Sequence, residues 1–442
     1  MSVQRISFKE INRLAIPAIF AGIVEPIISL TDTAVAGRLP ENADVALGAI
    51  GLVGSFLSAM IWVFLQTSNA LTALVAQGYG AGKTEKLKTL VSQVFYFNLF
   101  VSSILSITFF FLAEWIMQLY GADKDLLQTA VTYFQIRVWG FPLTLLTFTI
   151  FGIFRGLQNT AWAMKISIVG GVINAVLDII LVFVFHFDVE GIAWASLIAQ
   201  MTMFILALGF LYQKTPFRLQ KFFPIHPQFK QTLMMSLDLF LRTLSLNIAL
   251  FLAFRTATLL GGAEANQYVG AHAILIQIWL FSAFFLDGFS HAGAALSGRL
   301  LGSNQIKSLN LLVKDLIKVM FSLGILVSVL FLIFYRFFGE LLTQSESVLL
   351  VFYSAFWIVA LMQPINSIAF LFDGIYKGLG ETKVLRNVFL SALIFGFIPF
   401  LYFFQYLDLG IRGIWFAFVI WMLIRGGGLI FHFYKKYYKP IS

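Results

Sequence analysis

The most informative absences in this 442-residue chain are those of cysteine and of charge. Without cysteine, the protein has no disulfide, no thiol chemistry and no sulfur-ligated metal site. Charged residues make up only 12% of the chain, whereas about 25% is usual in soluble globular proteins, so that class is excluded. The five histidines show no metal-ligand spacing, and no Gly-x-x-x-x-Gly-Lys-Ser/Thr loop for nucleotide phosphates is present. We therefore expect no metal, no cofactor and no direct use of ATP.

Long apolar segments dominate what is present. Hydrophobic residues form 60% of the chain, and apolar runs of about 20 residues, enough to cross a hydrocarbon core of about 30 Å, recur throughout. The sequence therefore predicts an all-α integral membrane protein with twelve transmembrane helices, six in each half. The predicted spans are 14–36, 47–70, 89–112, 127–151, 164–185, 190–212, 234–260, 268–292, 309–335, 348–372, 387–405 and 411–434.

The basic residues are distributed unevenly between the two sides of these spans. Most of the 30 lysines and arginines fall on one side, and only Arg38, Lys124, Arg336 and Arg412 fall on the other. By the positive-inside rule, the basic side is cytoplasmic. We therefore expect a multi-pass protein of the cell (inner) membrane with both termini in the cytoplasm. The net charge of +9 then reflects topology rather than a nucleic-acid partner.

The two halves of the chain repeat each other at a constant offset. The repeated positions, each with the same residue 222 positions later, are Gly48, Gly80, Pro142, Gly156 and Gly191. Membrane transporters are often built from such repeats, with binding between or within the halves. The polar, proline-containing stretch 213–233 is the natural cytoplasmic linker. We therefore expect an N-terminal six-helix lobe at 1–212 and a C-terminal six-helix lobe at 234–442.

Two acids lie in the first predicted span. Glu25 and Asp32 are seven residues apart, or two helical turns, which places both on one face about 10 Å apart along the axis. Because charge is costly within hydrocarbon, such residues are functional candidates. Pro17 and Pro26 each remove a backbone donor from this span, so we expect it to bend or break. A purely structural interpretation has Asp32 at the outer end of the span, reaching to water.

A third acid lies deep in the fifth predicted span. Asp178 follows Asn174 by one helical turn, so both lie on one face of an otherwise apolar helix. A desolvated carboxylate prefers its proton and responds to the arrival of water, a cation or a cationic substrate. This behaviour suits a coupling site. The alternative is that Asn174 and Asp178 form a hydrogen-bonded structural pair between helices.

The second half carries its own charged residues. Asp238 and Arg242 are four residues apart near the cytoplasmic end of the seventh span, and this spacing favours a structural salt bridge. Asp287, Asp373 and Lys377 lie in the cytoplasmic halves of the eighth and tenth spans. An ion-pair network that holds an inner gate and a direct contact with substrate fit these three residues equally.

Five short motifs occur in order along the chain. They are EPIISLTDTA at 25–34, AQGYGAG at 76–82, RGLQNT at 155–160, NAVLD at 174–178 and DGIYKGLG at 373–380. In this order and topology the chain resembles the multidrug and toxic compound extrusion (MATE) transporters, and within them the prokaryotic DinF-like branch. The resemblance covers essentially the whole sequence.

This resemblance implies a mechanism. It implies two six-helix lobes, related by a pseudo-twofold axis along the membrane normal, that rock between inward-facing and outward-facing states. Entry of protons or sodium ions drives export. In similar prokaryotic members the coupling cation binds in the N-terminal lobe, at positions that match Asp32, Asp178 and Asn174 here.

The resemblance also extends to the cavity around that cation. Tyr133 and Ser196 fall near polar positions that line it, and we add Glu25 as a further cavity-lining candidate. Pro17 occupies the place of a proline that bends the first helix in the family, and Pro26 is a second candidate for bending.

Departures from the family pattern occur in the second half. Some relatives carry acidic cation ligands in the seventh and tenth spans, whereas this chain has Arg255 and Asn366 there. We therefore favour coupling in the N-terminal lobe, by protons rather than sodium, although both ions can use the same carboxylates. Arg255 joins Asp287, Asp373 and Lys377 as a candidate for the gate or structural network.

The sequence thus predicts a secondary antiporter, and not an enzyme. It would export amphipathic or cationic drugs or toxic metabolites in exchange for H+ or Na+. The alternative is a flippase of the same superfamily for a lipid-linked precursor or polysaccharide, which fourteen spans and a strongly cationic cavity would favour. The expected partners are small-molecule substrates and the lipid bilayer, and we expect the chain to act as a monomer.

Overall fold

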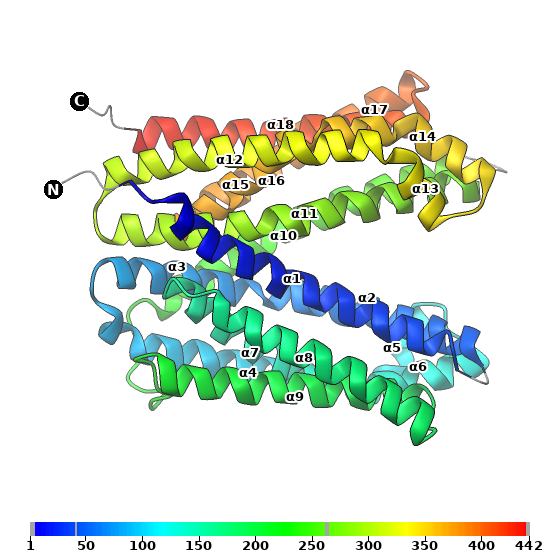
Figure 1. Ribbon diagram of the computed structural model, residues 1–442, viewed down its shortest axis with the longest axis horizontal. Coiled ribbons are helices and arrows are strands. Elements are labelled where there is room, and N and C mark those ends of the chain that lie inside the picture. Colours follow the sequence, from blue (N-terminus) through cyan, green and yellow to red (C-terminus); the bar gives the residue numbers. More distant parts are fainter. Residues whose placement is uncertain (1–4, 40–41, 261–264, 439–442) are drawn as a thin grey trace. The chain divides into compact units, whose positions relative to one another are not determined.

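The computed structural model describes residues 5–39, 42–260 and 265–438, and every regular element in these ranges is a helix (Figure 1). The chain forms two compact units. One, here called the N-unit, is Ile16–Ser236, and the other, the C-unit, combines Met1–Ala15 with Leu237–Ser442. The start of the first helix therefore groups with the second half of the chain.

The N-unit consists of helices that succeed one another with short connections. The first, α1, spans Phe8–Ala36 and enters the N-unit at Ile16. The other elements are α2 (Ala43–Phe64), α3 (Gln66–Gly80), η1 (Thr84–Leu87), α4 (Lys88–Phe111), α5 (Ala113–Leu119), α6 (Lys124–Arg137), α7 (Gly140–Gly156), α8 (Ala161–Ile179), the π-helical turn η2 (Ile180–Val184) and α9 (Val189–Lys214).

The C-unit, like the N-unit, consists of helices. Its elements are most of α10 (Phe229–Leu260), then α11 (Ala265–Gly302), α12 (Ile306–Ile333), α13 (Tyr335–Leu342), α14 (Glu346–Leu361), α15 (Gln363–Leu379), α16 (Thr382–Ser391), the π-helical turn η4 (Ala392–Phe397), α17 (Ile398–Tyr406) and α18 (Gly410–Tyr437). Helices α9 and α10 extend into the two ends of the predicted linker 213–233. The predicted lobe boundaries stay a prediction.

The helices are long and apolar enough for the predicted membrane class. Within the described residues, ten helices are long and apolar enough to span a membrane. Two bent helix pairs bring the number to twelve if each pair is one span. The prediction of an all-α membrane protein is confirmed. Helix α1 runs without interruption through Pro17 and Pro26, so the chain does not break there, and bending at these prolines stays a prediction.

The sequence repeat corresponds to a repeated break in one span of each unit. Helices α6 and α7 meet at an angle of 43°, and α14 and α15 meet at 53°. The repeated prolines lie just after these breaks, at Pro142 and Pro364. Proline is tolerated in the first turn of a helix because the backbone N–H it lacks has no partner there. Each proline thus marks where the second helix of its pair begins.

The repeated glycines bring pairs of helices into close contact. A Cβ at Gly156 of α7 would lie 2.7 Å from the side chain of Val75 in α3. A Cβ at the equivalent Gly378 of α15 would lie 2.0 Å from the carbonyl oxygen of Ala294 in α11. Both distances are shorter than van der Waals contact allows. Only glycine therefore permits these two helix pairs to approach as they do.

Candidate functional site

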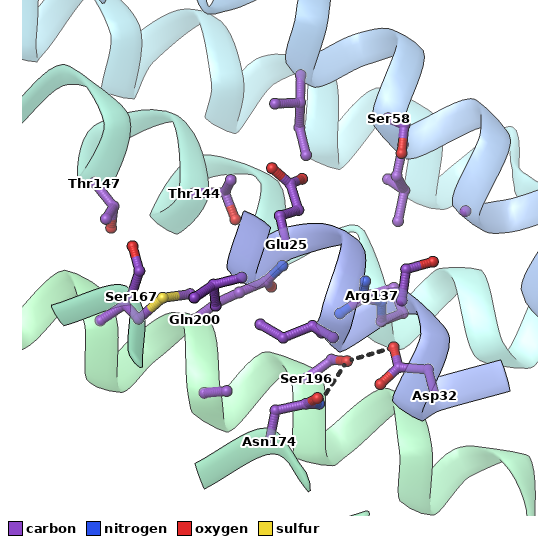
Figure 2. Close-up of a pocket in the computed structure, with 18 of the residues that line it drawn as sticks. Glu25, Asp32, Ser58, Arg137, Thr144, Thr147, Ser167, Asn174, Ser196 and Gln200 are labelled. Atoms are coloured by element: carbon purple, nitrogen blue, oxygen red, sulfur yellow. Dashed lines mark hydrogen bonds between the residues drawn. The ribbon is translucent and has the colours of Figure 1, made fainter. Parts of the chain in front are cut away.

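The N-unit contains an open cavity of ≈ 980 Å³ among its helices (Figure 2). Its walls combine apolar side chains with polar groups from six helices, α1, α2, α6, α7, α8 and α9. The charged and polar side chains that line it are Glu25, Ser29, Asp32, Ser58, Tyr133, Arg137, Thr144, Thr147, Ser167, Asn174, Ser196 and Gln200. A largely apolar cavity with a few convergent polar groups is typical of small-molecule sites.

Helical periodicity explains how so many polar side chains reach one cavity. On α1, Glu25, Ser29 and Asp32 recur at intervals of four and three residues. On α8, Ser167 and Asn174 are separated by seven residues, or two turns. Side chains at these spacings lie on the same helical face. Each of these helices thus presents polar side chains to the cavity along one face.

A hydrogen-bond chain joins two of the predicted coupling residues through a neighbouring serine. The amide Nδ2 of Asn174 donates to Ser196 Oγ at 3.2 Å, and Ser196 Oγ donates to Asp32 Oδ2 at 3.1 Å (Figure 2). Because α8, α9 and α1 supply these residues, the chain connects three helices. Ser196, placed by resemblance alone, therefore contacts both Asn174 and Asp32 directly.

Several oxygens in this cluster lack a hydrogen-bond donor. Among the described residues, no donor reaches Asp32 Oδ1, Asn174 Oδ1 or either carboxylate oxygen of Asp178. Asp32 is only 3% exposed, and Asn174 and Asp178 are fully buried. Burying a charged group without a partner is costly. The cluster therefore has acceptor oxygens that a proton or a small cation would satisfy.

The structure bears differently on the two structural alternatives, one for Asp32 and one for Asn174 with Asp178. The burial of Asp32 contradicts the idea that it reaches to water at the end of its helix. Asn174 does bond to a neighbouring helix, as the structural alternative expected. Asp178 faces the carboxyl group of Asp32, and no N–H or hydroxyl donor among the residues described reaches its oxygens. Asp178 also lies two residues before the π-helical turn η2. Such turns are frequent at functional sites.

The remaining cavity candidates differ in how exposed their side chains are. Tyr133, on α6, is buried at 2% exposure. Glu25, on α1, lines the cavity with an accessible side chain. The structure thus brings Glu25, Tyr133 and Ser196 to the same cavity as Asp32 and Asn174. Asp178 is not among the lining residues, but it is close enough to Asp32 for the charge of Asp32 to act on it.

Sequence reasoning gave no role to several polar residues of the cavity. Arg137, Thr144, Thr147 and Gln200 all line the cavity but belong to none of the motifs quoted above. Arg137, Thr144 and Thr147 follow one another by seven and three residues, a spacing that would place them on one face of an unbroken helix. Because the span is divided between α6 and α7 at a 43° bend, this spacing alone does not predict that they meet.

In the C-unit, the predicted salt bridge between Asp238 and Arg242 is wrong. Arg242 instead makes a two-pronged pair with Asp373, at 3.0 and 2.6 Å, and Asp238 pairs with Arg386 at 2.6 Å. An (i, i+4) pair on a helix surface contributes little. Partners on other helices, buried with better geometry, replace it.

The predicted gate or structural network is partly assembled. Lys377 lies 2.6 Å from Asp373, and Asp287 is close enough to both for their charges to act on it. Arg255, by contrast, is exposed on α10 and takes no part in the ion pairs found within the described ranges. The structure thus groups Asp287, Asp373 and Lys377 but not Arg255.

Two further polar residues of the C-unit are buried. Arg425 is 1% exposed and lies within α18. Its guanidinium carbon is 3.9 Å from the ring centre of Phe389 and 4.4 Å from that of Trp421. Asn366 is fully buried, and neither amide atom has a hydrogen-bond partner in the described part of the chain.

Comparison with known proteins decides the family. The model of the MatE family matches residues 17–180 and 244–403, which together are well over half of the chain and lie in both of its halves. The chain belongs to the MatE family. MatE proteins are membrane transporters, so this MatE protein is a transporter and not an enzyme.

Relatives and solved structures are similar to this chain along almost its whole length. The MatE protein is 26% identical to the DNA damage-inducible protein F of Escherichia coli over 436 residues, which cover 95% of this chain and 90% of that one. It is 23% identical to a probable multidrug resistance protein NorM of Pasteurella multocida, with 99% and 96% covered. It superposes on a mutant of the Vibrio cholerae MATE transporter VcmN with a TM-score of 0.88 at 20% identity, covering 97% and 96%. The MATE fold and the resemblance to the DinF-like branch are confirmed.

Proposed function

We propose that this MatE protein is a secondary antiporter that exports amphipathic or cationic compounds in exchange for H+ or Na+. The single observation that carries the proposal is the set of acceptor oxygens on Asp32, Asn174 and Asp178 that have no donor within the described residues. They lie beside an open cavity lined by apolar side chains and a few polar groups, as small-molecule sites are. A coupling ion and a substrate would thus bind within one compartment.

The chemistry of the cluster favours a cation as its occupant. Both carboxylates are buried in a helix bundle with a low effective dielectric, where a proton or a sodium ion removes the cost of unpaired charge. Hard cations such as sodium are held by oxygen ligands of this kind. Ser196 already donates to Asp32, so its hydroxyl fixes one carboxylate oxygen and leaves the other for the ion.

Exchange follows from competition for the same negative charge. Glu25 and Asp32 both line the cavity, so a cationic substrate there would be attracted to the carboxylates that hold the ion. Arrival of the ion would neutralise them and release the substrate. The apolar wall, which includes Phe148 and Phe151, would hold the rest of an amphipathic molecule.

We further propose that the two units rock between inward-facing and outward-facing states in the cell (inner) membrane, with both termini cytoplasmic. One structural relation supports the shared side of the termini. Arg5 pairs with Asp315 at 2.7 Å, and Asn310 donates to the carbonyl of Tyr437 at 3.2 Å. Asp315 and Asn310 lie in the first turns of α12. Both ends of the described chain thus contact one end of one helix.

The test is dye export in inverted membrane vesicles under an imposed pH or sodium gradient. We expect the wild-type protein to move a cationic dye under one of the two gradients, and Asp32→Asn and Asp178→Asn to lose gradient-driven transport, because an amide does not bind the ion. Asp188→Asn is the matched control, since Asp188 is exposed at the start of α9 and asparagine caps a helix as well as aspartate does.

Two outcomes would contradict the proposal. If both variants export as well as the wild type, coupling does not occur at these carboxylates. If neither gradient moves the dye but a fluorescent lipid-linked precursor is flipped across the vesicle bilayer, the flippase alternative is correct.

A further inference from the structure

Arg137 is a charged residue of the cavity for which the proposed coupling mechanism has no role. It is the last residue of α6, directly before the 43° bend to α7. It is partly buried and lines the cavity together with Glu25 and Asp32 (Figure 2). An arginine is charged at every accessible pH. The cavity therefore contains a permanent positive charge as well as its carboxylates.

The guanidinium of Arg137 has donors without acceptors. Its Nε and Nη1 atoms are buried, and neither has a hydrogen-bond partner among the residues that the structure describes. The group lies 5.9 Å from the ring centre of Tyr133, a contact that leaves its N–H donors free. Buried donors without partners are costly and rare in native proteins. Their usual explanation is a ligand or water that supplies the acceptors.

The nearby carboxylates do not supply these acceptors. The charge of Arg137 acts on Glu25 and on Asp32, but no ion pair joins it to either of them within the described ranges. The cavity thus presents positive and negative groups side by side without neutralising them. By contrast, the guanidinium of Arg242 in the C-unit makes a two-pronged pair with Asp373.

We infer that Arg137 binds the anionic group of an exported zwitterion, whose cationic group faces Glu25 and Asp32. The inference rests on the proposed function and narrows its substrate class. A guanidinium with unpaired N–H donors matches a carboxylate, whose oxygens accept charge-assisted hydrogen bonds from it. A compound with both charges satisfies both ends of the cavity. A simple monocation meets the carboxylates but is repelled by Arg137.

Binding of two closely matched probes tests this assignment. The probes are a rhodamine ethyl ester, which is a monocation, and the free-acid form of the same rhodamine, which is a zwitterion. Fluorescence anisotropy with the purified protein in lipid nanodiscs gives the affinity for each, without any ion gradient. We expect Arg137→Gln to weaken binding of the free acid by about tenfold or more and to leave binding of the ester unchanged or stronger. Arg137→Lys keeps the charge and should restore part of the difference.

The control variant is Arg38→Gln, which removes the same charge from an exposed position after α1. It should change neither affinity. The inference is wrong if Arg137→Gln changes both probes equally, which would indicate a structural role, or changes neither. It is also wrong if the wild-type protein binds the ester about tenfold more tightly than the free acid, a result that needs no variant. If neither probe binds, this inference fails, while gradient-driven export in vesicles still tests the proposed function separately.

Discussion

In the C-unit, the carboxylate of Asp373 is bound by Arg242 through two hydrogen bonds and lies 2.6 Å from Lys377. In the N-unit, neither carboxylate oxygen of Asp178 has a hydrogen-bond donor among the described residues. Both side chains are buried, at 1% and 0% exposure. In this repeated sequence, the buried acid of one half has charged partners, whereas that of the other half has no hydrogen-bond donor among the described residues.

This difference distinguishes a buried acid with a structural role from one that is a candidate for function. A buried ion pair with good geometry is hard to disturb, because removal of one partner leaves the other uncompensated. A buried acid without a partner costs stability and is retained where its chemistry is needed. This contrast supports the proposal that the coupling ion binds in the N-unit and not in the C-unit. Four experiments test this contrast, beginning with the largest expected effect.

Replacement of the paired acid should be the most damaging change. Asp373→Asn leaves Arg242 and Lys377 as uncompensated buried charges, so we expect a loss of about 3–5 kcal/mol in the free energy of unfolding. Thermal unfolding of the purified protein in detergent would show it as a large fall in transition temperature. Asp408→Asn, at an exposed loop position in the same unit, is the control. A loss no greater than in the control would mean that the pair contributes little.

Replacement of the unpaired acid should have the opposite sign. Asp178→Asn removes a buried group whose oxygens lack donors, so we expect unchanged stability or a gain of up to about 1–3 kcal/mol. The same measurement, run beside Asp188→Asn, checks it. A fall comparable with that of Asp373→Asn would show that Asp178 has a structural partner after all, and the contrast between the units would disappear.

The repeated glycines provide a comparison between equivalent positions. A Cβ at Gly378 would lie 2.0 Å from a backbone carbonyl, whereas the nearest atoms to a Cβ at Gly156 are side-chain carbons of Val75 at 2.7 Å. The overlap is deeper at Gly378, so Gly378→Ala should cost about 1–3 kcal/mol and Gly156→Ala less. Transition temperatures of the two variants give the order. A larger loss at Gly156 would contradict this order.

The smallest effect concerns a pair outside the membrane spans. Glu381 accepts hydrogen bonds from Lys436 and Tyr437. Burial alone would raise the pKa of its carboxyl, but these bonds outweigh burial and hold the pKa below its usual value. A lowered pKa stabilises the folded protein above the ordinary range of a glutamate and loses that contribution as the pH falls through the folded value.

Because this pair is partly exposed, Glu381→Gln should cost less than about 1 kcal/mol at neutral pH. The difference from the wild type should shrink as the pH is lowered below about 4, where the glutamate is protonated. Unfolding temperatures measured across this pH range give both values. A difference that persists unchanged in acid would show that the contact acts by packing and not by charge.

The local pattern of residues predicted much of this molecule. Apolar runs of membrane length predicted the spans, and the constant offset of Pro142 and Pro364 anticipated equivalent breaks in the fourth and tenth of them. The seven-residue spacing of Glu25 and Asp32 placed both on one face of α1. These predictions rest on helix geometry, which is a property of neighbouring residues and is the same in every apolar environment.

Partner choice was decided only when the helices packed. The same four-residue spacing occurs in Asp238–Arg242 and in Asp373–Lys377, yet only the second forms a pair, because Arg386 and Asp373 reach the first two residues from other helices. Likewise, no sequence pattern shows that Ser196 bonds to Asp32 across 164 residues, or that Nε and Nη1 of Arg137 meet no acceptor in the part of the chain that the structure describes. A helix sets which face a side chain occupies, but the neighbouring helices determine whether that side chain meets an opposite charge, a hydroxyl or an open cavity.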